Sequence, residues 1–150
     1  MSELNAALLA EIWRATREQK RMEDPDLARF QKFMVLHEDM HATWEALAAD
    51  PTTSLLVEGE NLLLHVAMDA ATEKALEEDQ PAGLRQAFQM LTARGFDPGR
   101  AFHVLSQAMM HEFLVQAEQG KEMDPPAFLT RVFDYAKQAM EQGPQEQNPE

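Results

Sequence analysis

The sequence predicts an all-α protein, a single-domain helical bundle of about six helices. Apolar residues recur at steps of three or four along most of the chain, which is the spacing of one face of an α-helix. Asp-Pro pairs occur at four places, where an N-cap acceptor precedes a residue preset for the first helical turn. No segment alternates apolar and polar residues in the manner of a half-buried strand. The three observations favour helices over a sheet.

The individual helices follow from start and stop signals. Starts are predicted at five X-Pro pairs, Asp24-Pro25, Asp50-Pro51, Gln80-Pro81, Asp97-Pro98 and Asp124-Pro125. Gly95 and Gly120 fit the left-handed position just past a helix end, and Asn61 fits a cap before Leu62. Residues 51–57 are compatible with a short helix. The predicted helices span residues 3–22, 25–49, 61–78, 81–94, 98–119 and 125–142.

Length and composition predict how these helices are organised. A chain of 150 residues suits one domain with a sizeable core, and we expect it over residues 1–142. Residues 143–150 are rich in Gln, Glu and Pro, so this tail is predicted to be disordered.

The charge balance limits the partners that the chain can bind. Twenty-six acidic residues against 13 Lys and Arg give a net charge of −13, which opposes binding to nucleic acid and to anionic membranes. No apolar run approaches the ~20 residues of a transmembrane helix. The acidic start, with Glu3 and Glu11, does not resemble a signal peptide, so a cytoplasmic location is expected. A homodimer is possible because symmetric pairs are common.

The histidines carry the main chemical signal. All five lie in predicted helices, and most are four or eight residues from another possible ligand, so that the pair shares one helix face. We expect the second, third and fifth helices to bring a metal-binding cluster together in the core. Its candidate ligands are His37, His41, His65, Asp69, His103 and His111.

The type of ligand indicates the metal. The chain has no cysteine, so a metal must use nitrogen and oxygen ligands, and imidazoles with a carboxylate favour non-haem iron, with zinc next. No organic cofactor is expected. The ferritin-like di-iron pattern needs Glu-x-x-His on two helices, and the sequence has it once, at Glu38 and His41. A hemerythrin-like site is similar in ligand count only.

Two other functions fit the same residues. The histidines can form a metal-free network of buried hydrogen bonds in a helical interaction module. Alternatively, His37-Glu38-Asp39-Met40-His41 matches the H-E-x-x-H motif of zinc hydrolases, in which the glutamate activates water. Asp39 is charged where such motifs carry uncharged residues, and an all-helical chain lacks the strand edge that binds their substrate. The sequence therefore leaves the enzyme class open.

One stretch of the chain resembles a known family. Asn61, His65 and Asp69, followed by Asp79-Gln80-Pro81-x-Gly83-Leu84-Arg85, resemble a small proteobacterial family catalogued as a domain of unknown function. That family carries N-x3-H-x3-H and D-Q-P-x-G-I-R, with an earlier H-x3-H that His37 and His41 match and a later histidine that His103 matches. The resemblance covers roughly residues 30–130. It implies a shared fold without a known activity.

The chain departs from that family at three positions. Asp69 stands where a second histidine is usual, and Gln107 and His111 stand where acidic residues are usual. Asp69 keeps ligand chemistry, whereas Gln107 is a poor metal ligand.

Overall fold

The protein is described by a computed structural model that places residues 4–122 and 124–144. The predicted all-α class is confirmed, because α-helices dominate and strands are confined to one short hairpin among these residues. The chain divides into two compact units, Met1–Ala70 and Ala71–Glu150. Each unit has its own buried core.

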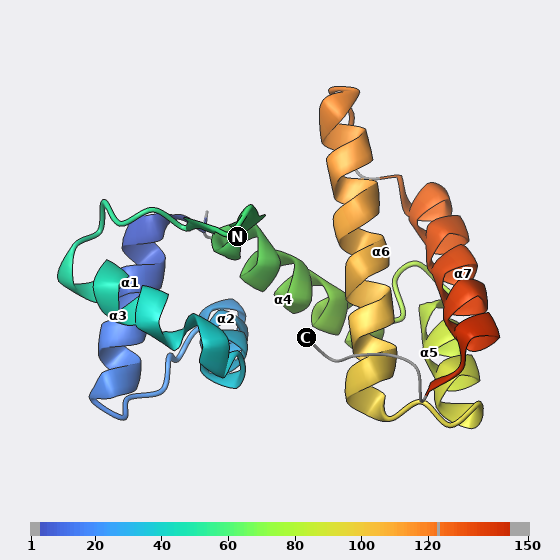
Figure 1. Ribbon diagram of the computed structural model, residues 1–150, viewed down its shortest axis with the longest axis horizontal. Helices are drawn as coiled ribbons and strands as arrows, with labels where there is room; N and C mark the ends of the chain where they lie inside the picture. The colour runs from blue at the N-terminus through green and yellow to red at the C-terminus, as the bar shows by residue number, and fades with distance from the viewer. Residues whose placement is uncertain (1–3, 123, 145–150) are drawn as a thin grey trace. The chain divides into compact units, whose positions relative to one another are not determined.

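The first unit is built around three helices, which Figure 1 shows gathered together. They are α1 (Ala6–Arg17), α2 (Pro25–Leu36) and α3 (His41–Ala49), with the 3-10 turn η1 (Glu38–Met40) between the last two. The short strands β1 (Leu56–Val57) and β2 (Glu60–Asn61) lead into α4 (Leu62–Glu78), whose first half completes the unit. Its core contains the fully buried side chains of Leu9, Ile12, Met34, Trp44 and Leu47.

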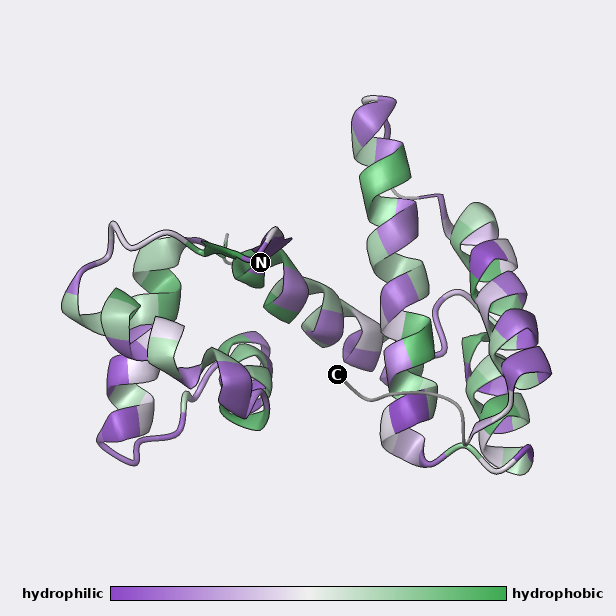
Figure 2. Ribbon diagram, in the orientation of Figure 1, coloured by the Kyte–Doolittle hydropathy of each residue, from purple (hydrophilic) through white to green (hydrophobic). Residues whose placement is uncertain are grey.

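The second unit contains the rest of α4 and three further helices. These are α5 (Leu84–Ala93), α6 (Pro98–Glu118) and α7 (Pro125–Gln142), and α7 packs against both α5 and α6. These helices carry both hydrophobic and hydrophilic residues, as the colours of Figure 2 show. Leu84, Leu91, Leu105 and Val132 are fully buried there.

Three of the four Asp-Pro helix starts are confirmed. The Asp24, Asp97 and Asp124 side chains accept hydrogen bonds from the first-turn backbone N–H groups of α2, α6 and α7. Such a cap contributes about 1 kcal/mol, and the proline that follows has no N–H left to satisfy. Gly95 and Gly120 have positive φ, 94° and 70°, just past α5 and α6, as predicted.

The fourth Asp-Pro pair ends a helix, so the predicted start at Asp50 is wrong. The Asp50 carboxylate accepts hydrogen bonds from the hydroxyl (2.6 Å) and the backbone N–H (3.0 Å) of Thr52, and these bonds lower the pKa of Asp50. Residues 51–57 do not form a helix. Instead β1 pairs antiparallel with β2, with Leu56 opposite Asn61, through a two-residue turn. Both turn residues, Glu58 and Gly59, have positive φ, which suits the twist of a tight hairpin.

The turn between α4 and α5 contains the Asp-Gln-Pro segment. The helix predicted from residue 81 begins at Leu84, and Pro81 lies in the turn. Arg85 reaches back, and its guanidinium donates to the backbone carbonyls of Leu76 (Nε, 2.8 Å) and Glu77 in the last turn of α4. Asp79 accepts a hydrogen bond from the Arg85 backbone N–H (3.0 Å), which lowers the pKa of Asp79. The segment therefore ends one helix and starts the next.

The helix predicted over residues 25–49 is broken at His37. That residue has φ −89° and ψ 83°, outside the helical region, and the chain makes one 3-10 turn before α3 begins at His41. His37 and His41 therefore do not share one helix face. This break determines which histidines meet.

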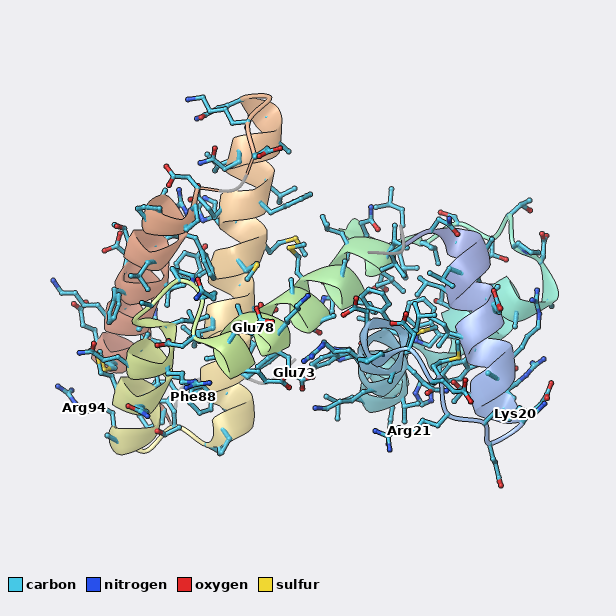
Figure 3. The ribbon with its side chains drawn as sticks, turned by 180° about the vertical axis from the view of Figure 1, so that it is seen from behind. Lys20, Arg21, Glu73, Glu78, Phe88 and Arg94 are labelled. Atoms are coloured by element: carbon cyan, nitrogen blue, oxygen red, sulfur yellow. The ribbon has the colours of Figure 1, made fainter. Side chains whose placement is uncertain are left out.

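Lys20 and Arg21 follow the end of α1, and Arg94 lies at the end of α5 (Figure 3). Positive charge at these ends interacts favourably with the helix dipole.

Gly143 ends α7, and the predicted disordered tail lies mostly outside the described residues, since 145–150 are not placed. Among the helices of residues 4–122 and 124–144, none has the length and apolar character needed to cross a membrane.

Candidate metal centre

Two helix ends in the first unit bring three candidate ligands together. His37 is the residue at which α2 ends, His65 lies in the first turn of α4, and Asp69 follows one turn later. His37 Nε2 lies 2.7 Å from Asp69 Oδ2, and His65 Nε2 lies 3.3 Å from the same oxygen. The two imidazole rings meet edge to face, with centroids 4.8 Å apart. Asp69 is thus shared by two histidines.

The spacing of these atoms suits one coordination sphere. One ligand atom from each residue lies within 4.8 Å of the others. Ligands bound at about 2.0–2.2 Å around one ion lie about 3 Å or a little more from each other, so the two short distances match neighbouring ligands. The Asp69 side chain is 7% exposed, against 26% for His37 and 21% for His65. A buried carboxylate with half-buried imidazoles is a chemically competent ligand set.

Local structure explains why these side chains converge. The Asn61 side chain caps α4 by accepting from the Leu64 N–H (3.1 Å), which fixes where the helix begins. Leu62 and Val66 are buried on its inner side, and Asp69 is buried with them. Phe33, buried in α2, stacks on the His37 ring at 6.5 Å. Each of the two helices thus fixes one side of the His37–Asp69 contact.

The acidic neighbours of His65 shift its pKa. The hydrogen bond with Asp69 raises the pKa of His65 above its usual value, and the negative charges of Asp69 and Glu60 add to this effect while burial opposes it. A metal binds neutral imidazole, so protons compete with a metal for this nitrogen.

His41 has a different role from the one that its spacing predicts. Its Nε2 donates to the Val35 backbone carbonyl (2.9 Å), one of the carbonyls left without a helical partner where α2 ends. Its ring lies against Trp13, with centroids 5.0 Å apart. The expectation that His37 and His41 project together from one helix is wrong, because the chain leaves the helix between them. His41 caps α2 and covers the core.

The H-E-x-x-H geometry is also absent at this position. That motif requires both histidines on one helix, whereas His37 precedes the 3-10 turn and His41 begins α3. Glu38 is exposed on the turn. The sequence match to zinc hydrolases therefore does not extend to the arrangement of the residues.

The remaining candidates lie on α6, in the second unit. His103 is half-buried, and Gln107 and His111 are exposed. His111 Nδ1 accepts a hydrogen bond from the Tyr135 hydroxyl (2.7 Å), and the Arg131 guanidinium lies 3.3 Å from the same nitrogen. The group that the first unit assembles thus contains three of the six candidate residues.

The sequence did not predict a partly buried ion pair beside His111. Glu112 is 1% exposed, and its carboxylate accepts from Arg131 Nε (2.8 Å) and from the Gln116 side chain. Burial alone would raise the pKa of Glu112, but these hydrogen bonds outweigh it and lower the pKa. The i,i+4 spacing of Glu112 and Gln116 is a signal, yet it does not distinguish this glutamate from the other acids of the chain.

Comparisons with known proteins place the chain by family alone. Residues 3–134 match a family model described as Domain of unknown function (DUF1841). No curated protein and no solved structure matches the chain.

Proposed function

The chain belongs to this domain-of-unknown-function family, and we propose that its first unit binds one divalent transition-metal ion through His37, His65 and Asp69. One observation supports the proposal above the others: a buried carboxylate oxygen lies 2.7 Å and 3.3 Å from two imidazole nitrogens that come from different helices. Ordinary packing does not require this convergence, and a metal would satisfy all three groups at once.

The donor set favours non-haem iron(II), with zinc as the second candidate. Two histidines and one carboxylate form the ligand set of mononuclear iron sites that keep open coordination positions. Zinc also accepts three protein ligands with water in the fourth position. Both ions would leave room for water or a small ligand, because the three protein groups occupy only part of the coordination sphere. Such an ion could acidify bound water, polarise a carbonyl or bind oxygen.

A metal-free interaction module is the second candidate. The observation in its favour is that Asp69 already pairs with both histidines, so the cluster is hydrogen-bonded without an ion. A carboxylate that pairs with a histidine of raised pKa can be purely structural. Metal content separates the two functions.

We expect His65→Ala to remove the metal and to lower the melting temperature. Binding to the folded state alone stabilises it, by about 2.7 kcal/mol when free metal is a hundred times the Kd. Elemental analysis and thermal unfolding with and without a chelator measure both effects. His111→Ala is the control, because it removes an exposed histidine from the second unit. Equal melting of chelated and untreated wild type, without detectable metal, would instead support the interaction module.

Glu38→Gln should leave the metal content and the melting temperature unchanged. Glu38 is exposed on η1, and the broken helix takes it out of the H-E-x-x-H arrangement. If that arrangement formed in solution, Glu38 would be the general base, and the variant would keep its metal but lose hydrolysis. A peptidase assay of zinc-loaded wild type and Glu38→Gln checks this, and turnover that disappears only in the variant would contradict the expectation.

A further inference from the structure

A second carboxylate faces His65 from the side opposite to Asp69. Glu60, on β2, places Oε2 3.3 Å from His65 Nδ1, while Asp69 Oδ2 lies 3.3 Å from His65 Nε2. The two ring nitrogens therefore point to different acids. If Nε2 binds a metal, Nδ1 keeps its hydrogen and donates a hydrogen bond to Glu60. A carboxylate that accepts from the second nitrogen of a ligand histidine fixes the orientation of the ring and raises its basicity.

The hairpin holds Glu60 in this position. Its turn is the Glu58–Gly59 pair with positive φ, and β2 continues directly into α4. The Leu62 backbone N–H donates to the Leu55 carbonyl (2.9 Å), which closes the base of the hairpin next to the helix start. Glu60 and His65 are thus connected through a short, hydrogen-bonded segment.

We infer that Glu60 is the positioning residue for His65, and that metal binding is coupled through it to the β1–β2 hairpin. The inference rests on the proposed function. Coupling between two sites is reciprocal, so a hairpin that orients His65 for the metal is itself stabilised when the metal binds. Glu60 touches no metal and acts through His65 alone.

The competing explanation is an ordinary surface ion pair. The Glu60 side chain is 54% exposed, and exposed pairs contribute little to stability. Such a pair would not couple the metal affinity of the site to the protection of the hairpin's backbone amides from hydrogen exchange. Glu58 provides the matched control, because it is an exposed acid of the same hairpin, two residues away. Removing its charge changes the field near the site without changing the partner of His65.

Zinc(II) affinity tests the inference through competition with a chromophoric chelator. Glu60→Ala should weaken zinc binding about tenfold, the lower end of the effect of such orienting carboxylates. Glu60→Gln keeps one acceptor oxygen and should lose less, while Glu58→Gln should stay within about twofold of wild type. Hydrogen exchange gives the second measurement. Zinc should slow exchange of the backbone amides of residues 56–61 in wild type and not in Glu60→Ala.

The outcomes separate this inference from the function on which it rests. If wild type binds zinc and Glu60→Ala binds it equally well, with the same protection of the hairpin, the positioning role is wrong and the metal site stands. If wild type binds neither zinc(II) nor iron(II), the metal site itself is wrong and the inference fails with it. Circular dichroism of each variant shows whether it has folded, and Glu60→Gln replaces Glu60→Ala if the latter has not.

Discussion

Replacing Asp69 with alanine should deplete bound metal about tenfold or more. Asp69 is the one residue of the proposed site that contacts both histidines, at 2.7 Å and 3.3 Å, so its loss would remove a proposed ligand and free two imidazole rings to rotate. The charge of the site also changes, because the carboxylate would neutralise one charge of a divalent ion. Elemental analysis of protein purified in parallel with wild type measures the depletion.

Two further variants make this test specific. Asp69→Asn keeps the shape of the side chain and should lose most of the metal, because a neutral amide is a weaker ligand than a carboxylate. Asp39→Ala removes an exposed acid from η1 and should keep full occupancy. Full occupancy in Asp69→Ala would exclude Asp69 from the site and would leave the two histidines without a common anchor.

Replacing Arg131 with methionine should destabilise the second unit by about 1–3 kcal/mol, which is the cost of leaving a buried hydrogen-bonding group without its partner. Arg131 Nε lies 2.8 Å from the Glu112 carboxylate, whose side chain is 2% exposed. Without the guanidinium, the buried Glu112 carboxylate keeps its hydrogen bond from the Gln116 side chain but loses the one from Arg131. Denaturant unfolding followed by circular dichroism measures the loss, with Arg94→Met at an exposed site as the control.

The contribution of Glu112 to the pH dependence of stability should change sign in Arg131→Met. In wild type the pKa of Glu112 is lowered, so the pair stabilises the fold above the unfolded pKa of 4.5, and this stability is lost as pH falls through the folded pKa. In Arg131→Met we expect burial to dominate and to raise the pKa of Glu112. Protonation at low pH then removes the unpaired buried charge, so the variant should be less destabilised in acid. Adding Glu112→Leu to the variant should also recover stability. A destabilisation that neither change relieves would contradict the assigned cause.

Local signals predicted the helices well where they act alone. The caps at Asp24, Asp97 and Asp124 and the glycines after α5 and α6 depend only on nearby residues, and all are confirmed. Asp50-Pro51 carries the same two residue types but ends α3, because Thr52 takes the carboxylate that would otherwise cap a new helix. An Asp-Pro pair therefore predicts that a helix boundary is present more securely than it predicts whether a helix starts or ends there.

The candidate site shows the same limit of local reasoning. His65 and Asp69 are one turn apart on α4, so their shared face follows from spacing. The break at His37 does not follow from spacing, because it is stabilised by contacts between elements, His37 with Asp69 and His41 with the end of α2. One residue outside the helical region thus separates two histidines that periodicity places side by side.

Arg85 gives the Asp79-Gln80-Pro81 segment a structural role. Its guanidinium holds the carbonyls that end α4, and Asp79 holds the Arg85 backbone in turn. The Asp79–Arg85 segment therefore has a structural role in this chain, and that role does not depend on what the first unit binds. The proposed ligands His37, His65 and Asp69 lie in the first unit, whereas this turn lies in the second. The turn and the proposed ligands therefore act in different parts of the molecule.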